Sequence, residues 1–95
     1  MFIVTLTFSA NRDSAGEYLE RHKEWIRRGF DDGVFLLAGG LQPGLGGCLL
    51  AHNTSYESLA SRVNQDPFVV EGIVMAEILD VTPTRADDRL AFLFD

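Results

Sequence analysis

Few side chains in this sequence could do acid–base chemistry, and His22 has the most unusual setting among them. At about 100° per residue, His22 lies near the centre of the apolar side of a predicted helix over residues 14–30. That side is formed by Ala15, Tyr18, Leu19, Trp25, Ile26 and Phe30. An imidazole directed inward needs a hydrogen-bond partner, because an unpaired buried polar group is costly. A carboxylate partner would orient the ring and hold one tautomer, which suits general acid–base catalysis.

Three carboxylates are candidates for that partner: Asp66, Glu71 and Glu77. We favour Asp66, because Pro67 restrains the backbone at the end of a second predicted helix and fixes a short carboxylate on a rigid loop. Two helices that lie side by side on a sheet would bring this loop near the middle of the first helix. A core histidine that a carboxylate satisfies, with no part in catalysis, is an equally open interpretation.

Other reactive side chains give weaker signals. Cys48 and Ser9 are conceivable nucleophiles, but no spacing connects either of them to the histidine. With two histidines and no clustered carboxylates we expect no metal site and no cofactor. The glycine-rich segment 41–47 lacks the Lys-Ser/Thr ending of a phosphate-binding loop and leads into a strand, so we do not expect it to hold phosphate.

The elements that would position these side chains follow from the hydrophobic pattern. Strands are predicted over residues 2–8, 34–38, 48–52 and 73–81, and helices over 14–30 and 55–63. Ser14 with Glu17 and Thr54 with Glu57 have the spacing of capping boxes at the two helix starts. Residues 68–72 form a short connection, with room for one helical turn.

The order β-α-β-β-α-β predicts an α+β fold with a ferredoxin-like antiparallel sheet and both helices on one face. The other face would carry apolar side chains with few charges, and the tail over residues 83–95 is also apolar. Soluble monomers rarely expose such a surface, so we expect a homodimer with the tail docked on its own domain or on the partner subunit.

Length and composition agree with one small domain over residues 1–95, with its core in 1–82 and the tail after it. A net charge of −6 and basic residues interleaved with acidic ones argue against a nucleic-acid partner. The first eight residues resemble neither a signal peptide nor a membrane span, so we expect no membrane partner and a cytoplasmic location.

Several motifs, in this order, resemble the YciI-like (YCII-related) family. They are residues 21–26, Leu37 to Gly40, Gly46-Gly47, residues 54–59 and above all Asp66-Pro67-Phe68. The resemblance extends to about residue 82 and implies a dimeric α+β barrel, a homodimer or higher homo-oligomer, and an active site on His22 and Asp66. A few related proteins act on chlorinated lactones or aromatic-pathway intermediates. Gly40 stands where many members have proline, and the tail has no counterpart in the family.

Two interpretations of function follow from these residues. The first is a small enzyme in which His22, oriented by Asp66, performs isomerisation, elimination or lactone-type chemistry on a small apolar organic substrate. Its cavity would lie between the first helix and the sheet, with Trp25 and Phe68 as walls. The alternative is a non-catalytic small-molecule-binding or accessory dimeric module in which the His-Asp pair is structural. A pure oligomerisation scaffold is a third option and predicts no cavity.

Overall fold

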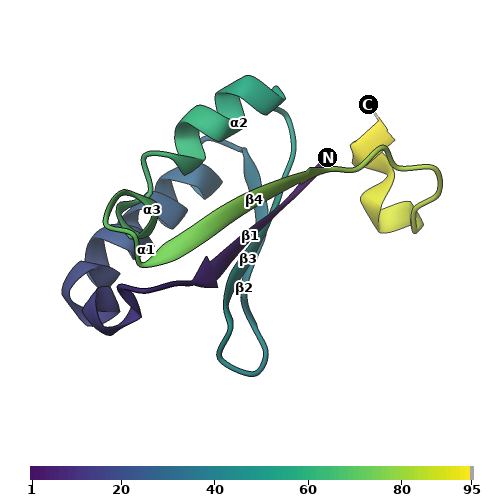
Figure 1. The fold of residues 1–95 in the computed structure, drawn as a ribbon. Coiled ribbons are helices and arrows are strands. Elements are labelled where there is room, and N and C mark those ends of the chain that lie inside the picture. The colour runs from purple at the N-terminus through teal and green to yellow at the C-terminus, as the bar shows by residue number, and fades with distance from the viewer. Residues whose placement is uncertain (95) are drawn as a thin grey trace.

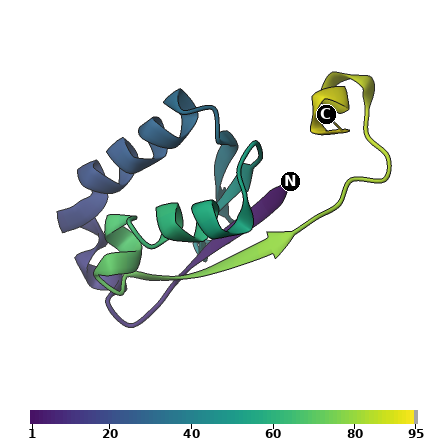
Figure 2. The same cartoon turned by 90° about the horizontal axis from the view of Figure 1, so that it is seen from above.

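A computed structural model, which describes residues 1–94, shows a four-stranded antiparallel sheet with helices packed on one face (Figures 1 and 2). The strands are β1 (Phe2–Phe8), β2 (Phe35–Leu41), β3 (Gly46–Ala51) and β4 (Val74–Asp80). The helices are α1 (Ala15–Asp31), α2 (Tyr56–Val63) and α3 (Pro67–Val70), with 3-10 turns η1 (Arg12–Ser14) and η2 (Asp88–Phe94). The sheet order is β2-β3-β1-β4 with antiparallel neighbours, which confirms the predicted ferredoxin-like α+β fold.

The core lies between the sheet and the helices, as the alternation along β1 dictates. Phe2, Val4 and Leu6 are buried on the helix side, because successive strand residues point to opposite faces. Val4 pairs with Leu49 of β3, which is also buried. From the helix layer, Trp25, Leu59, Val63 and Phe68 fill the space above these strands.

Both helix starts differ from the predicted capping boxes. The Ser14 side chain makes no capping bond, because Ser14 ends the 3-10 turn η1 and its own backbone is helical. A capping residue needs an extended backbone so that its oxygen can turn back onto the first amides. At α2 that role is taken by Ser55, whose oxygen accepts the backbone N–H of Ser58 at 3.1 Å. The predicted cap at Thr54 is therefore displaced by one residue.

Helix α1 lies very close to β2 near its C-terminal end, and Gly29 makes this approach possible. A Cβ atom on Gly29 would lie 2.1 Å from the ring of Phe35. The ring of Phe35 instead packs over the bare backbone and also meets Trp25 edge-on at 5.2 Å. The helix then ends at Gly33, whose φ of +74° is a left-handed conformation that glycine adopts without cost. The path of α1 across the sheet is thus fixed at this end.

The β2–β3 hairpin is longer than the sequence suggested. We expected the glycines to end both strands, yet β2 continues through Gly39 and Gly40 to Leu41, and β3 begins at Gly46. Glycine is a poor strand former, but its backbone groups pair normally, and Gly40 lies opposite Gly47 in the register. The prediction of a loop over 41–47 was therefore wrong, and the actual turn covers residues 42–45.

The sheet face away from the helices carries several exposed apolar side chains. Leu37, Met75 and Leu79 are each more than two-fifths exposed on this face. The tail leaves β4 beside the N-terminus and stands off from the body of the molecule in both views (Figures 1 and 2). Its Phe92 ring meets the ring of His52 edge-on at 5.6 Å. Within residues 1–94, no helix combines the length and apolar character that crossing a membrane requires.

Candidate active site

The structure brings His22 and Asp66 into direct contact. The Nδ1 atom of His22 lies 2.7 Å from Oδ1 of Asp66. Asp66 is fully buried, and the side chain of His22 is 13% exposed. If the carboxylate is ionised and the imidazole neutral, Nδ1 donates its proton to the carboxylate and Nε2 keeps a free lone pair. The two other carboxylates considered lie elsewhere: Glu71 is exposed at the end of α3, and Glu77 lies on the far face of the sheet.

The local sequence explains why Asp66 is held so firmly. Proline at the first position of α3 suits the helix start and keeps the preceding residue extended, and Asp66 has φ −60° and ψ 124°. In this conformation Oδ1 also accepts the backbone N–H of Phe68 at 3.0 Å. One carboxylate oxygen therefore caps α3 and orients His22. Oδ2 has no hydrogen-bond partner among residues 1–94, so both bonds that the protein makes to this buried carboxyl group are to Oδ1.

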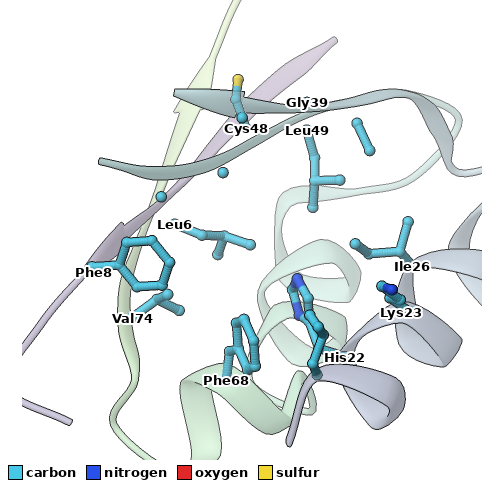
Figure 3. A pocket seen from close by; sticks show the side chains of 15 residues that line it. Leu6, Phe8, His22, Lys23, Ile26, Gly39, Cys48, Leu49, Phe68 and Val74 are labelled. Carbon is cyan, nitrogen blue, oxygen red and sulfur yellow. The ribbon is translucent and has the colours of Figure 1, made fainter. Parts of the chain in front are cut away.

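Aromatic contacts fix the plane of the His22 ring. The ring of Phe68 stacks on it at a centroid distance of 4.0 Å with an angle of 2° between the planes. Trp25 lies on the same helix at 6.0 Å and at 22°. Figure 3 shows that one ring nitrogen of His22 points into open space between α1 and the sheet. The imidazole is thus held by Asp66 at one nitrogen while the opposite edge stays accessible.

That open space is a cavity of about 480 Å³ between α1, α3 and the sheet. Its volume is in the range of about 300–1,000 Å³ that is usual for small-molecule sites. The apolar side chains that line it, most of them visible in Figure 3, are Leu6, Phe8, Leu19, Ile26, Leu49, Phe68 and Val74. Such a lining favours an apolar ligand, with His22 as the main polar group that meets it.

The far wall of the cavity is formed by the hairpin glycines. Gly40 and Gly47 face each other across β2 and β3, and Gly47 is opposite Leu6 on β1, whose side chain points to the helices. With no side chains at these two positions, the space under α1 stays empty. This feature was not among those predicted from the sequence. The signal that could have found it is the register that places one glycine opposite the other on the helix side.

Besides His22, the charged side chain of Lys23 lines the cavity. It is 61% exposed, and its ammonium lies 3.7 Å from a carboxylate oxygen of Glu20. This places a flexible positive charge at the solvent side of the opening, next in sequence to the histidine. The ammonium of Lys23 could therefore attract a ligand that carries or develops negative charge at the mouth of the cavity.

The remaining predicted site residues fall into different places. Phe68 lines the cavity, but Trp25 does not: it is buried among the helices, where its indole N–H donates to the carbonyl of Arg62 at 3.0 Å. The sulfur of Cys48 points away from the cavity in Figure 3. The hydroxyl of Ser9 donates to the carbonyl of Gly72 at 2.6 Å. Neither of the two possible nucleophiles is therefore in contact with His22.

Metal binding finds no support in the described part of the chain. Residues 1–94 contain no group of three or more histidine, cysteine, aspartate or glutamate side chains that could hold an ion together. His52 lies at the opposite end of β3 from the cavity, where it contacts the tail.

Comparison with solved structures places the fold. No protein-family model matches the sequence, and comparison with curated proteins gives no match either. A similar solved structure is that of 5-chloro-2-hydroxyhydroquinone dehydrochlorinase (TftG) from Burkholderia phenoliruptrix AC1100, in complex with 2,5-dihydroxybenzoquinone. The two share 13% sequence identity with a TM-score of 0.69, over 86% of this chain and 94% of the other. At this identity the likeness establishes a shared fold.

Proposed function

We propose that this protein is a small enzyme in which His22 and Asp66 perform general acid–base chemistry on a small apolar organic substrate in the cavity. The observation that carries the proposal is the orientation of the imidazole. Its Nδ1 is bound to a fully buried carboxylate, and its other edge faces an apolar cavity large enough for a ligand. A histidine sealed in the core with no space beside it would have argued for a purely structural pair.

In this proposal Nε2 of His22 removes a proton from a substrate carbon next to a carbonyl group. Asp66 stabilises the imidazolium that forms and keeps the ring in one tautomer. For elimination, the electron pair of the broken C–H bond forms a new double bond, and the leaving group departs with its own bonding pair. For isomerisation, the same nitrogen returns the proton to another carbon. Neither course needs a protein nucleophile.

Elimination is the reaction class that we place first. The solved structure that shares this fold is named as a dehydrochlorinase, and loss of hydrogen chloride is an elimination. The sequence motifs around His22 and Asp66-Pro67-Phe68 resemble the YciI-like family, and we propose that the chain is a member of it. Lactone-type chemistry stays within the same proposal where it begins with removal of a proton from the carbon next to the lactone carbonyl.

The first experiment uses 2,5-dihydroxybenzoquinone and a panel of chlorinated hydroxyquinols, lactones and other small carbonyl compounds as probes. Binding is measured by thermal shift, and proton exchange at carbon is followed by NMR in D₂O. We expect one class of compound to bind and to exchange its acidic C–H with enzyme present. His22→Gln, whose amide can still donate to Asp66, should lower the exchange rate by roughly 10²–10⁴-fold. Equal rates for the two proteins would refute the catalytic proposal.

A non-catalytic binding module is the second candidate, and one observation favours it: Asp66 has a structural task as the cap of α3. Asp66→Asn separates the two interpretations. The amide oxygen can still accept the N–H of Phe68, while the negative charge beside the imidazole is lost. If the pair is catalytic, Asp66→Asn should fold normally and slow the exchange of the substrate proton. If the pair is structural, neither protein should accelerate proton exchange, and the variant should bind the probe with unchanged affinity.

We also propose that two copies associate through the sheet face away from the helices and that the tail docks against the partner subunit. Support comes from the exposed Leu37, Met75 and Leu79 on that face and from the exposed Leu90 and Phe94 on the tail. Light scattering at micromolar concentration should give a dimer or a higher homo-oligomer. Met75→Glu should shift the mass to a monomer, and Glu57→Gln, on exposed α2, should not. A monomeric wild type would refute this arrangement.

A further inference from the structure

A second hollow, of about 280 Å³, lies between α1 and α2 and shares no residue with the cavity at His22. Helix α2 and the residues after it contribute Ser58, Ser61, Arg62 and Gln65, which follow one face of a helix at spacings of three and four residues. The other wall is formed by Trp25, Arg28 and Asp32. Unlike the apolar cavity under α1, this hollow is lined mainly by side chains that donate hydrogen bonds.

Two guanidinium groups dominate its chemistry. Arg62 is held in place, because its Nη2 donates to Oδ2 of Asp32 at 2.8 Å and three-quarters of the side chain is buried. A guanidinium has five N–H donors, so most of those on Arg62 remain for a ligand. Arg28 has no ion-pair partner within residues 1–94, although it is close enough to Glu24 to help lower the pKa of that carboxyl, an effect due mainly to Arg27.

The charge of the hollow is opposite to that of the whole molecule. The chain carries a net charge of −6, yet the lining combines two arginines with one aspartate. Ser58 and Ser61 are small, so they leave the space open and present hydroxyl groups instead of filling the seam between the helices. The amide of Gln65 adds further donors. These donor side chains come from two helices and line one hollow, which is more than an ordinary solvated helix surface requires.

We propose that this hollow binds a small organic phosphate. Paired guanidinium groups match the oxygens of a phosphate dianion, and hydroxyl and amide donors complete the set. The volume is near the lower end of small-molecule sites, which suits a compact metabolite and not a polymer. Trp25 also lines the hollow, so the organic part of the ligand would lie near an aromatic side chain. This site is independent of the chemistry proposed at His22.

The experiment uses Trp25, the sole tryptophan of the chain, as the reporter. The full chain is titrated with inorganic phosphate, phenyl phosphate and phenol at constant ionic strength set by chloride. Tryptophan fluorescence and the indole N–H resonance are followed. We expect a saturable response to both phosphates and none to phenol or chloride.

Matched variants test the arginines. Arg28→Gln should weaken phenyl phosphate binding by roughly tenfold or more, because a charge-assisted contact is lost. Arg62→Gln should weaken it as well, while the backbone carbonyl of Arg62 continues to hold Trp25. Arg27→Gln is the control, since this neighbouring guanidinium binds Glu24 and Asp31 outside the hollow.

Four outcomes would overturn the proposal. The first three are a response to phosphate that is not saturable, unchanged affinity in Arg28→Gln, and an equal loss in Arg28→Gln and Arg27→Gln. The third would show non-specific attraction between an anion and a positively charged helix. Binding of phenol as tightly as phenyl phosphate would likewise refute phosphate recognition.

Discussion

Helix α1 contributes side chains to two sets of polar contacts, one buried on its inner side and one exposed on its outer side. On the inner side, His22 meets the buried carboxylate of Asp66 beneath the ring of Phe68. On the outer side, Arg27 lies between Glu24 and Asp31, and all three are largely exposed. The inner pair joins elements far apart in the chain, whereas the outer set joins neighbours within one helix.

The difference shows what each set can do. Exposed ion pairs are screened by water, and each contributes little to stability. A buried carboxylate costs free energy unless its oxygens are bonded, so its contacts decide whether the surrounding segment folds correctly. We therefore expect the inner pair to affect stability more than the outer set, and it is also the pair to which the proposed proton transfer is assigned.

The largest effect is expected where the inner pair loses its carboxylate. Asp66→Ala removes the cap of α3 and the partner of His22 together, and it should lower the free energy of unfolding by about 2–4 kcal/mol. Urea denaturation measures this loss. Asp66→Asn is the control, because its amide oxygen retains the bond from Phe68, and it should recover most of the stability. A similar loss in both variants would mean that charge, and not capping, holds the segment.

Removing the other partner should have a somewhat smaller effect. His22→Ala leaves the carboxylate of Asp66 buried without the imidazole and should cost about 1–3 kcal/mol. The matched outer variant is Arg27→Ala, which should leave the denaturation midpoint nearly unchanged, because its partners stay solvated. Equal stability of His22→Ala and Arg27→Ala would show that the buried contact on α1 stabilises the fold no more than the exposed ones.

Much of this contrast can be read from the sequence, because it depends on local patterns. The apolar stripe around His22 fixes which side of α1 faces the core, and Asp66-Pro67 carries its own backbone restraint and cap. The presence of strands follows from the strong alternation in β1 and the run of apolar residues in β2. These signals lie within a few residues, so no knowledge of distant contacts is needed.

What the sequence did not reveal depends on contacts between distant segments. Gly40 and Gly47 open the cavity only because the register places them opposite each other on the helix side, and a local pattern suggests a loop there instead. Trp25 has the right spacing to line a cavity below α1, but its indole N–H donates to the carbonyl of Arg62 on α2 instead. Trp25 also lines the second hollow, which no sequence motif predicts.

The glycines allow a direct test of the cavity with an effect on binding more than on folding. Gly40→Val adds a side chain on the helix side, where a Cβ atom has no contact closer than 3.8 Å. It should weaken binding of a ligand at His22, with 2,5-dihydroxybenzoquinone as the first probe, by roughly tenfold. Gly39→Val is the control, because its side chain would point to the far face, where a Cβ atom meets nothing within 4 Å. Equal affinities in both variants would place the ligand outside this cavity.

The smallest effect is expected on the outer side of α1. A hydrogen bond from Arg27, and the charge of Arg27 and Arg28, hold the pKa of Glu24 below its ordinary range. A carboxyl with a lowered folded-state pKa stabilises the fold above its unfolded pKa and loses that contribution as the pH falls through the folded value. The free energy of unfolding of Glu24→Gln should therefore equal that of the wild type in acid. At neutral pH and low salt it should be slightly lower, and high salt should remove the difference. Urea denaturation at several pH values and two salt concentrations measures the difference. A loss at neutral pH as large as that of His22→Ala would show that exposed contacts on α1 stabilise the fold as strongly as the buried pair, and the functional distinction between the two faces would no longer follow from burial.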